Sequence, residues 1–437
     1  MSARPPHNPL RIGIAGLGTV GGGVVKLAQE GRVGAGAVEI AAVSARDRGR
    51  ARAVDISHYR WVDDPRALAA DPAIDVLVEV IGGADGPARD AVEIALKRGA
   101  HVVTANKALL ALHGAELARL SEAQGGKLLF EAAVGGGVPV VKALKESLAG
   151  ADVRAIAGIL NGTCNYILSE MEASGRAFAD VLADAQRLGY AEADPTTDIG
   201  GFDAAHKITL LAAIGFGALP DYEHVKIEGV DLVTLDDIRL AGRLGYRIKL
   251  IAKAERIDGA VSMHVGPALV AMDHPLAAVS GALNAAVIDS DPVGRLTFVG
   301  RGAGAGPTAA AVVADLIDLA QGRAGHAFAR PVAALQAAPR GAPAERGRFY
   351  MRLLVRDRPG VIAAVSDQLG RQSVSIESFL QMPGGQAPTV PIVLTTQACA
   401  RSALDAAALA IATLDAVAEP PRVFPIEEAD DRARFWS

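Results

Sequence analysis

Residues Leu10–Gly21 have the sequence LRIGIAGLGTVG, a short apolar run that passes directly into a glycine-rich turn. The run Leu10–Ala15 predicts a buried strand, and the pattern of Val20–Gln29 predicts a helix after the turn. The turn itself has the spacing G-x-G-x-x-G, and a strand before it and a helix after it are the setting that a dinucleotide-binding turn requires. The stretch therefore predicts an α/β fold with a Rossmann-type parallel sheet.

The three glycines of this turn have separate steric roles. Gly16 permits the tight turn, Gly18 lets a pyrophosphate approach the backbone, and Gly21 lets the helix pack closely on the strand. The first helical N–H groups, at Thr19 and Val20, would face the phosphates. A purely structural turn is the alternative, and the flanking strand and helix argue against it.

The rest of the first third alternates between strand-like and helix-like segments, which predicts βαβ units and a parallel sheet covered on both faces. The predicted strands are Val38–Val43, Ile74–Ile81, His101–Thr104 and Lys127–Phe130, and the predicted helices are Pro87–Arg98 and Ala108–Gln124.

The end of the second strand indicates which dinucleotide binds. NAD-binding proteins usually place Asp or Glu there to accept a hydrogen bond from the ribose hydroxyl. Here Ser44 and Ala45 come first, and Arg46 or Arg48 would neutralise a 2′-phosphate. NADP(H) is therefore favoured, while Asp47 leaves NAD(H) possible. Solvated loop charges are the alternative explanation of the two arginines.

The remaining chain predicts an α+β region and a small C-terminal region. We expect a nucleotide-binding domain at residues 1–138, completed by 300–325, a substrate-binding and dimerisation domain at 139–299, a linker at 331–347 and a third domain at 348–430. The predicted middle strands are Val153–Leu160, Val225–Ile227, Arg247–Ala254 and Val261–Val270, and the predicted helices are Asn165–Ala173, Phe178–Leu188, Ala204–Ile214 and Thr308–Gln321.

The composition of the 437 residues argues against several classes of protein. Half of the residues are hydrophobic and 21% are charged, which argues against wholesale disorder, and a net charge of −5 disfavours nucleic acid as a partner. No apolar run reaches the roughly 18–20 residues of a membrane span, and the first residues lack a signal-peptide pattern. Cys164 and Cys399 are too few for a disulfide framework, so we expect a cytoplasmic protein.

The segment Ala185–Lys207, AQRLGYAEADPTTDIGGFDAAHK, places charged groups on a strongly apolar helix. Asp203 and Lys207 are four residues apart and share one face of that helix. An exposed ion pair is one explanation. The surrounding residues are apolar, however, and a charged pair on a buried helix is costly unless it has partners. The pair is therefore a candidate active site.

This segment resembles the signature of the homoserine dehydrogenase family. Gly158–Ile167 (GILNGTCNYI) and Glu131–Pro139 (EAAVGGGVP) are also similar to family segments, and the resemblance covers about residues 10–325. It implies reversible reduction of L-aspartate 4-semialdehyde to L-homoserine in threonine, methionine and isoleucine biosynthesis. The matching signature positions are Ala185, Gly189, Tyr190, Asp194, Pro195, Asp198, Ile199, Gly201, Asp203 and Lys207.

The resemblance also implies roles for individual residues. A nicotinamide cofactor would deliver hydride to the aldehyde carbon, and Lys207 would donate the proton to the substrate oxygen. Lys107 would lie near the nicotinamide at the carboxyl end of a strand, where open α/β sheets bind ligands. Glu192, Asp198 and Asp203 would hold the substrate.

Further positions match cofactor and metal contacts of the family. Gly189 and Glu192 match cofactor contacts, and Gly302 and Gly304 match a turn that closes over the cofactor, for which a structural loop is the alternative. The resemblance also implies a structural sodium ion. Its expected ligands are Glu131, Val134, Gly136 and Val138.

The last ninety residues resemble an ACT domain, which has a ferredoxin-like fold. This resemblance implies an amino-acid effector at the turn around Gly360, with threonine as the pathway end product. An ACT module used only for oligomerisation is the alternative, and the family implies a homodimer or homotetramer. The predicted elements are the strands Arg348–Val355, Ser373–Leu380 and Val390–Thr396 and the helices Gly360–Gly370 and Ser402–Leu414.

Two other functions differ in what the sequence should contain. Another NAD(P)-dependent oxidoreductase acting on an amino-acid aldehyde would lack the Asp203 and Lys207 signature. A phosphorylating one would need a nucleophilic cysteine, whereas Cys164 is better explained as a small buried hydrophobe. An amino-acid sensor with an inactive body would have lost the lysine or the glycine turn, and the sequence contains both.

Overall fold

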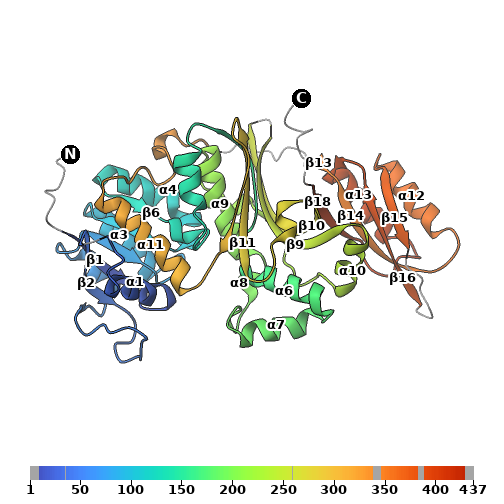
Figure 1. Ribbon diagram of the computed structural model, residues 1–437. Coiled ribbons are helices and arrows are strands. Elements are labelled where there is room, and N and C mark those ends of the chain that lie inside the picture. Colours follow the sequence, from blue (N-terminus) through green and yellow to red (C-terminus); the bar gives the residue numbers. More distant parts are fainter. Residues whose placement is uncertain (1–8, 35, 258, 338–345, 382–387, 429–437) are drawn as a thin grey trace.

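The computed structural model describes residues 9–34, 36–257, 259–337, 346–381 and 388–428. The molecule is elongated, with a helix-covered sheet at the N-terminal end, long strands in the middle and a second α/β unit at the C-terminal end (Figure 1). None of the helices in these ranges is long and apolar enough to cross a bilayer. The expectations for residues 1–8, for 338–345 of the linker and for 429–430 lie outside the described residues.

The N-terminal sheet has six parallel strands in the order β3-β2-β1-β4-β5-β6. The chain leaves β1 toward β2 on one side and later enters β4 on the other side, so the carboxyl ends of β1 and β4 flank a topological switch point. The predicted Rossmann-type sheet is confirmed. Its strands are β1 (Leu10–Ala15), β2 (Val38–Ser44), β3 (Arg60–Trp61), β4 (Val76–Glu79), β5 (His101–Thr104) and β6 (Leu128–Leu129).

Helices cover both faces of this sheet because successive strand residues are apolar on both sides. Ile12 and Ile14 belong to one buried cluster with Val312, while Ala15 and Leu77 belong to the cluster on the other face. The last of these helices, from residues 305–320, packs against the first. They are α1 (Thr19–Gln29), α2 (Pro65–Ala70), α3 (Pro87–Lys97), α4 (Lys107–Gln124) and α11 (Ala305–Ala320).

The middle of the molecule is an antiparallel sheet in the order β12-β11-β7-β9-β10, with β8 beside β10. Its strands are β7 (Asp152–Ile159), β8 (Lys226–Ile227), β9 (Tyr246–Ile257), β10 (Ala260–Ala271), β11 (Leu283–Asp291) and β12 (Gly294–Arg301). Its helices are α5 (Val140–Lys142), a π-helical turn (Ala143–Ser147), α6 (Gly162–Ser174), α7 (Phe178–Arg187), α8 (Thr196–Ile199), α9 (Phe202–Phe216) and α10 (Leu235–Arg243). As predicted, α9 is buried on nearly all sides.

The C-terminal region has the βαββαβ element order of a ferredoxin-like fold. Its strands and helices are β14 (Phe349–Arg356), α12 (Val361–Arg371), β15 (Ile376–Gln381), β16 (Thr389–Thr396), α13 (Arg401–Ala412) and β18 (Arg422–Glu427), beside the small pair β13 (Arg346–Gly347) and β17 (Cys399–Ala400). Strand β18 pairs with β14 and also, in parallel, with β10. The middle and C-terminal sheets are therefore continuous.

The start of the predicted linker lies against the rest of the molecule. Val332 and Leu335 are buried, and Gln336 exchanges backbone hydrogen bonds with Gly217 and Leu219. This contact attaches the segment to the end of α9 before the chain reaches the C-terminal region.

Candidate active site

The glycine turn between β1 and α1 has the geometry of a dinucleotide cradle. Gly16 has a φ of +107°, and a Cβ atom on Gly21 would lie 1.9 Å from the Gly16 carbonyl oxygen, so both positions require glycine. A Cβ atom on Gly18 would meet nothing within 4 Å. Helix α1 has no side-chain cap, which leaves the N–H groups at Thr19 and Val20 for an anion. These residues fit the pyrophosphate of a dinucleotide.

A buried glutamate connects this turn to the end of β5. Glu79 is fully buried and accepts hydrogen bonds from Ile81 N at 2.8 Å and from the Thr104 hydroxyl at 2.6 Å. A Cβ atom on Gly16 would lie 2.6 Å from Val80 O, so the glycine turn contacts the same loop. Thr104 ends β5, and α4 begins at Lys107 three residues later.

Two lysines from different helices bind the two oxygens of Asp203. Lys207 Nζ lies 2.6 Å from Asp203 Oδ2, and Lys107 Nζ lies 3.2 Å from Asp203 Oδ1. Asp203 is 5% exposed and Lys207 8% exposed, whereas 40% of the Lys107 side chain is exposed. Lys207 also donates to Leu160 O at 2.7 Å. The predicted pair is thus part of a triad. Asp203 and Lys207 are its buried members, and Lys107 lies on the solvent side.

The electrostatics of this triad follow from burial and the two positive charges. Burial alone would raise the pKa of Asp203, but the charges of Lys207 and Lys107 and hydrogen bonds from Lys207 and Asn161 lower that pKa overall. The charge of Asp203, opposed by burial, raises the pKa of Lys107. Asp203 is therefore ionised, and its negative charge stabilises the charged form of Lys107.

Asp198 lies next to the triad through shared hydrogen bonds. Asn161 Nδ2 donates to Asp198 Oδ1 at 2.8 Å and to Asp203 Oδ2 at 2.9 Å. The Thr163 hydroxyl shares its one proton between Tyr190 O at 2.7 Å and Asp198 Oδ2 at 3.1 Å. Asn161 also caps α6 by accepting from Cys164 N. Burial and the charge of Asp203 raise the pKa of Asp198. The start of α6 thus fixes two carboxylates of the site.

The predicted cofactor-contact arginines lie in the loop that follows β2. Arg46 and Arg48 are exposed, and the Arg48 guanidinium lies 6.0 Å from the ring centre of Trp61. Asp47 accepts a hydrogen bond from Gly49 N at 2.8 Å, which directs one oxygen of this carboxylate into its own loop. Among the described residues, the buried Ser44 hydroxyl has no hydrogen-bond partner.

The remaining predicted cofactor contacts lie on separate segments. Gly304, with a φ of +112°, precedes α11, and a Cβ atom on Gly302 would lie 2.0 Å from the side chain of Asn284. Gly189, with a φ of +78°, follows α7. Glu192 is exposed, and its charge is one of those that raise the pKa of Lys107. The structure therefore brings Lys107, Asp198, Asp203 and Lys207 together, with Glu192 on the solvent side.

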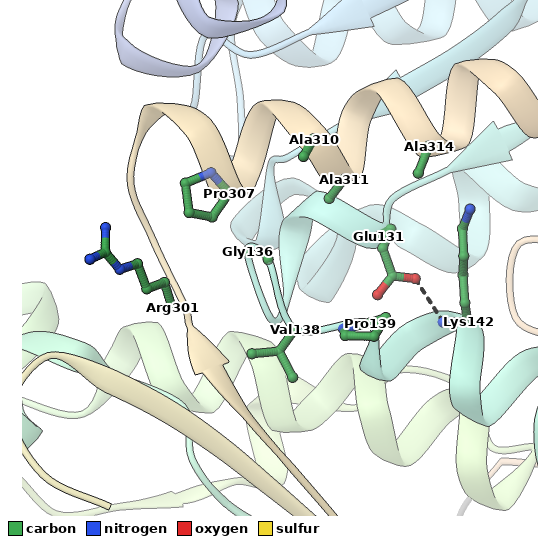
Figure 2. A pocket seen from close by; sticks show the side chains of 11 residues that line it. Glu131, Gly136, Val138, Pro139, Lys142, Arg301, Pro307, Ala310, Ala311 and Ala314 are labelled. Carbon is green, nitrogen blue, oxygen red and sulfur yellow. Dashed lines mark hydrogen bonds between the residues drawn. The ribbon is translucent and has the colours of Figure 1, made fainter. Parts of the chain in front are cut away.

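Three of the four expected sodium ligands line one hollow of about 370 Å³ (Figure 2). They are Glu131, Gly136 and Val138, and the hollow also borders the first turns of α11. Glu131 is buried and accepts hydrogen bonds from Val141 N and Lys142 N. Among the described residues, no cluster of three or more His, Cys, Asp or Glu side chains suits a metal. Val134 does not line this hollow. Carboxylate and backbone carbonyl oxygens are the ligand types that a hard cation prefers.

Several site residues carry no individual assignment from the sequence. Asn161 and Thr163 lie inside the quoted GILNGTCNYI stretch, where an Asn before a helix is an N-cap signal. Glu79 is an acidic residue at the carboxyl end of an otherwise apolar strand. Open α/β sheets bind ligands at this end of their strands, so the sequence does contain a signal for this residue. Asn284 gives no such signal, because its position depends on a strand pairing that the sequence does not predict.

The glycine cradle at the switch point, together with a buried lysine and aspartate that contact Lys107 after β5, defines an NAD(P)-dependent oxidoreductase. Residues 139–317 match the family model described as homoserine dehydrogenase, and residues 16–131 match the one described as homoserine dehydrogenase, NAD binding domain. The chain belongs to the homoserine dehydrogenase family, and its activity is the reversible NAD(P)H-dependent reduction of L-aspartate 4-semialdehyde to L-homoserine.

Similar proteins extend over nearly the whole chain. The homoserine dehydrogenase of Neisseria gonorrhoeae is 41% identical over 436 residues, which cover 97% of this chain and all of that relative. A crystal structure of a homoserine dehydrogenase from Thiobacillus denitrificans has a TM-score of 0.91 and 40% identity, and the match covers 97% of this chain and 99% of that chain. A hyperthermophilic archaeal homoserine dehydrogenase in complex with NADPH has a TM-score of 0.62 and 26% identity, with 73% of this chain and 99% of that chain covered.

Proposed function

We propose that Lys207 donates the proton to the aldehyde oxygen during reduction, and that Asp203 and Lys107 hold and assist it. The main support for this proposal is the set of hydrogen bonds that Lys207 makes. Its ammonium group has three donors, and Leu160 O and Asp203 Oδ2 take two of them. Among the described residues no further partner occupies the third, which is left for a substrate oxygen.

The residues of the chain then have distinct tasks. A bound reduced nicotinamide supplies the hydride. Negative charge that builds on the substrate oxygen is stabilised by the Lys207 ammonium, which then releases its proton to that oxygen. Lys107, on the other oxygen of Asp203, keeps a second positive charge within the site. Asp203, Asp198 and Glu192 are the carboxylates that hold the substrate, and Asp203 is the one among them that both lysines contact.

Substitution of Lys207 tests this proposal. Lys207→Ala should lower kcat by about 10²–10⁴-fold, the usual contribution of an acid–base group, with the dissociation constant for NADPH unchanged within about threefold. Lys97→Ala is the matched control, because Lys97 lies on the surface of α3. Retention of more than about a tenth of kcat by Lys207→Ala would contradict the assignment.

We also propose that NADP(H) is the preferred cofactor. Arg46 and Arg48 follow the end of β2, and their charge suits a 2′-phosphate. The Asp47 carboxylate accepts from its own loop, which makes it a weaker partner for a ribose hydroxyl. The NADPH complex of the archaeal relative also supports this preference. The other cofactor contacts that we propose are Gly16, Gly18, Thr19, Val20, Gly21, Lys107, Gly189, Glu192, Gly302 and Gly304.

A structural sodium ion at Glu131, Val134, Gly136 and Val138 is part of the same proposal. Its support is that three of these residues line one hollow and that carboxylate and carbonyl oxygens are the ligands a hard cation prefers. The segment 131–138 contacts residue 301, because Gly137 N donates to Arg301 O at 3.0 Å. A bound ion would strengthen this contact.

We propose that residues 348–430 act as an ACT domain that binds threonine, and that the chain forms a homodimer or homotetramer. The βαββαβ order and the turn at Gly360, which precedes α12, support an effector site of this kind. The division into domains at 1–138 with 300–325, 139–299 and 348–430 belongs to this proposal. Cys164 and Cys399 are both unpaired, which suits a cytoplasmic location.

A further inference from the structure

The carbonyl group that holds Lys207 has a second donor. Leu160 O accepts from Lys207 Nζ at 2.7 Å and from Asn284 Nδ2 at 3.0 Å. Asn284 is 3% exposed and is the second residue of β11. Because Ala285 pairs with Ile159, its neighbour Asn284 comes next to Leu160, which follows the end of β7. A rigid strand pairing therefore sets where this amide meets the carbonyl.

The same amide also lies against the turn that follows β12. A Cβ atom on Gly302 would lie 2.0 Å from Asn284 Cγ, and one on Gly162 would lie 3.2 Å from Asn284 Oδ1. The amide therefore fills the space between the start of α6 and the turn of Gly302 and Gly304. A shift of that turn would press directly on the group that shares the carbonyl with Lys207.

Packing alone does not explain an asparagine at this position. Among the described residues, the buried Asn284 Oδ1 has no hydrogen-bond partner. An unpaired buried polar atom costs free energy that an apolar side chain of similar size would avoid. The residue is thus best explained by what its Nδ2 donor does at Leu160 O.

We propose that Asn284 is a positioning residue for the proton donor. By sharing Leu160 O it fixes that carbonyl and weakens its hold on the lysine ammonium, and it transmits the position of the Gly302 turn to the lysine. This inference rests on the proposed role of Lys207. Asn284 of β11 would thus act on the reaction through Lys207, without a contact of its own to substrate or cofactor.

Three single variants and one double variant test it. Asn284→Ala should lower kcat by about 10–100-fold in both directions, the scale of a small misplacement of a catalytic group. The KM for the aldehyde and the dissociation constant for NADPH should stay within about threefold, since neither ligand loses a direct contact. Asn284→Leu has a similar size and no donor, so it should lose at least as much. Ser290→Ala, a buried position at the far end of the same strand, should keep wild-type kcat.

The pH profile separates positioning from a structural role. Without the Asn284 donor, Leu160 O binds the ammonium more strongly, so the midpoint of the acidic limb of kcat for homoserine oxidation should move to higher pH. The double variant Asn284→Ala with Lys207→Ala should be no slower than Lys207→Ala alone. Thermal unfolding of each variant establishes that the fold is retained.

Each result has a defined meaning. Wild-type kcat in Asn284→Leu would show that the residue only fills space, and an unmoved pH midpoint or a multiplicative loss in the double variant would also overturn the inference. If Lys207→Ala itself kept more than a tenth of kcat, the proposed role of Lys207 would fail instead, and that outcome is visible before any Asn284 variant is compared.

Discussion

Lys207 and Lys249 are two buried lysines in very different surroundings, and only Lys207 belongs to the triad. The positive charge of Lys207 is paired with the carboxylate of Asp203. Lys249 on β9 is 2% exposed, and its Nζ donates to neutral oxygens. Those oxygens are Val279 O at 2.7 Å, Asn165 Oδ1 at 3.1 Å and Ser169 Oγ at 3.4 Å. Burial lowers the pKa of Lys249 to about 8, although the charge of Glu172 opposes the shift.

This shift predicts a stability that rises with pH. An unfolded lysine has a pKa of about 10.4, so between pH 8 and 10 the unfolded state binds more protons than the folded state, and stability increases. From pH 7.5 to 10, Lys249 should contribute a gain of about 2 kcal/mol. Urea unfolding at both pH values should show this gain in the wild type and in Lys97→Met but not in Lys249→Met. Parallel pH dependence in all three proteins would rule out the assignment.

The sequence specifies only part of the residue-scale picture. The contact between Asp203 and Lys207 follows from their spacing on one helix. The approach of Lys107 to the same carboxylate does not, because it depends on how α4 packs against α9. Asn284 was unpredictable for the same reason, since its role depends on the register between β11 and β7.

At the scale of elements, strongly patterned segments were predictable and irregular ones were not. The eight strands and helices predicted for the first third of the chain match within a few residues, and the strand expected at Ile74–Ile81 is shorter, Val76–Glu79. The hairpin of β11 and β12 escaped prediction because polar residues and Gly294 interrupt its apolar pattern. Helix α10 was also not predicted. The signal that marks its start is the capping box of Thr234 and Asp237.

The turn between β1 and α1 gives a prediction that separates folding from binding. Gly21→Ala would place a Cβ atom 1.9 Å from a backbone oxygen, so it should lower the free energy of unfolding by about 2 kcal/mol or more. Gly18→Ala meets no protein atom, so it should leave stability within about 1 kcal/mol but weaken NADPH binding at least tenfold. Chemical unfolding and NADPH fluorescence titration measure the two effects. Full NADPH affinity in Gly18→Ala would contradict the cradle.

For the whole molecule, the C-terminal region is attached through both backbone and side chains. Strand β18 pairs with β10, and Arg352 of β14 contacts Asp237 of α10 at 2.7 Å, with 8% and 0% of their side chains exposed. Helix α10 packs against α6, whose start holds Asp198 through Asn161 and Thr163. A continuous set of contacts thus joins the proposed effector domain to the active site.

Loss of this ion pair should be costly because it would leave a buried carboxylate without its cation. Arg352→Met should lower the free energy of unfolding by about 3–5 kcal/mol. Arg358→Met is the matched control, because its pair with Asp415 is exposed on both sides, and it should cost no more than about 1 kcal/mol. Equal, small losses in the two variants, measured by urea unfolding, would show that the C-terminal region is not held through Arg352.

The central claim, that Lys207 is the group that exchanges a proton with the substrate oxygen, is tested most directly by a crystal structure with NADP⁺ and L-homoserine bound. We predict the homoserine hydroxyl oxygen within about 2.6–3.2 Å of Lys207 Nζ, on the donor that Leu160 and Asp203 leave open. A hydroxyl bound to Lys107 instead, with Lys207 Nζ beyond hydrogen-bond distance, would contradict the account.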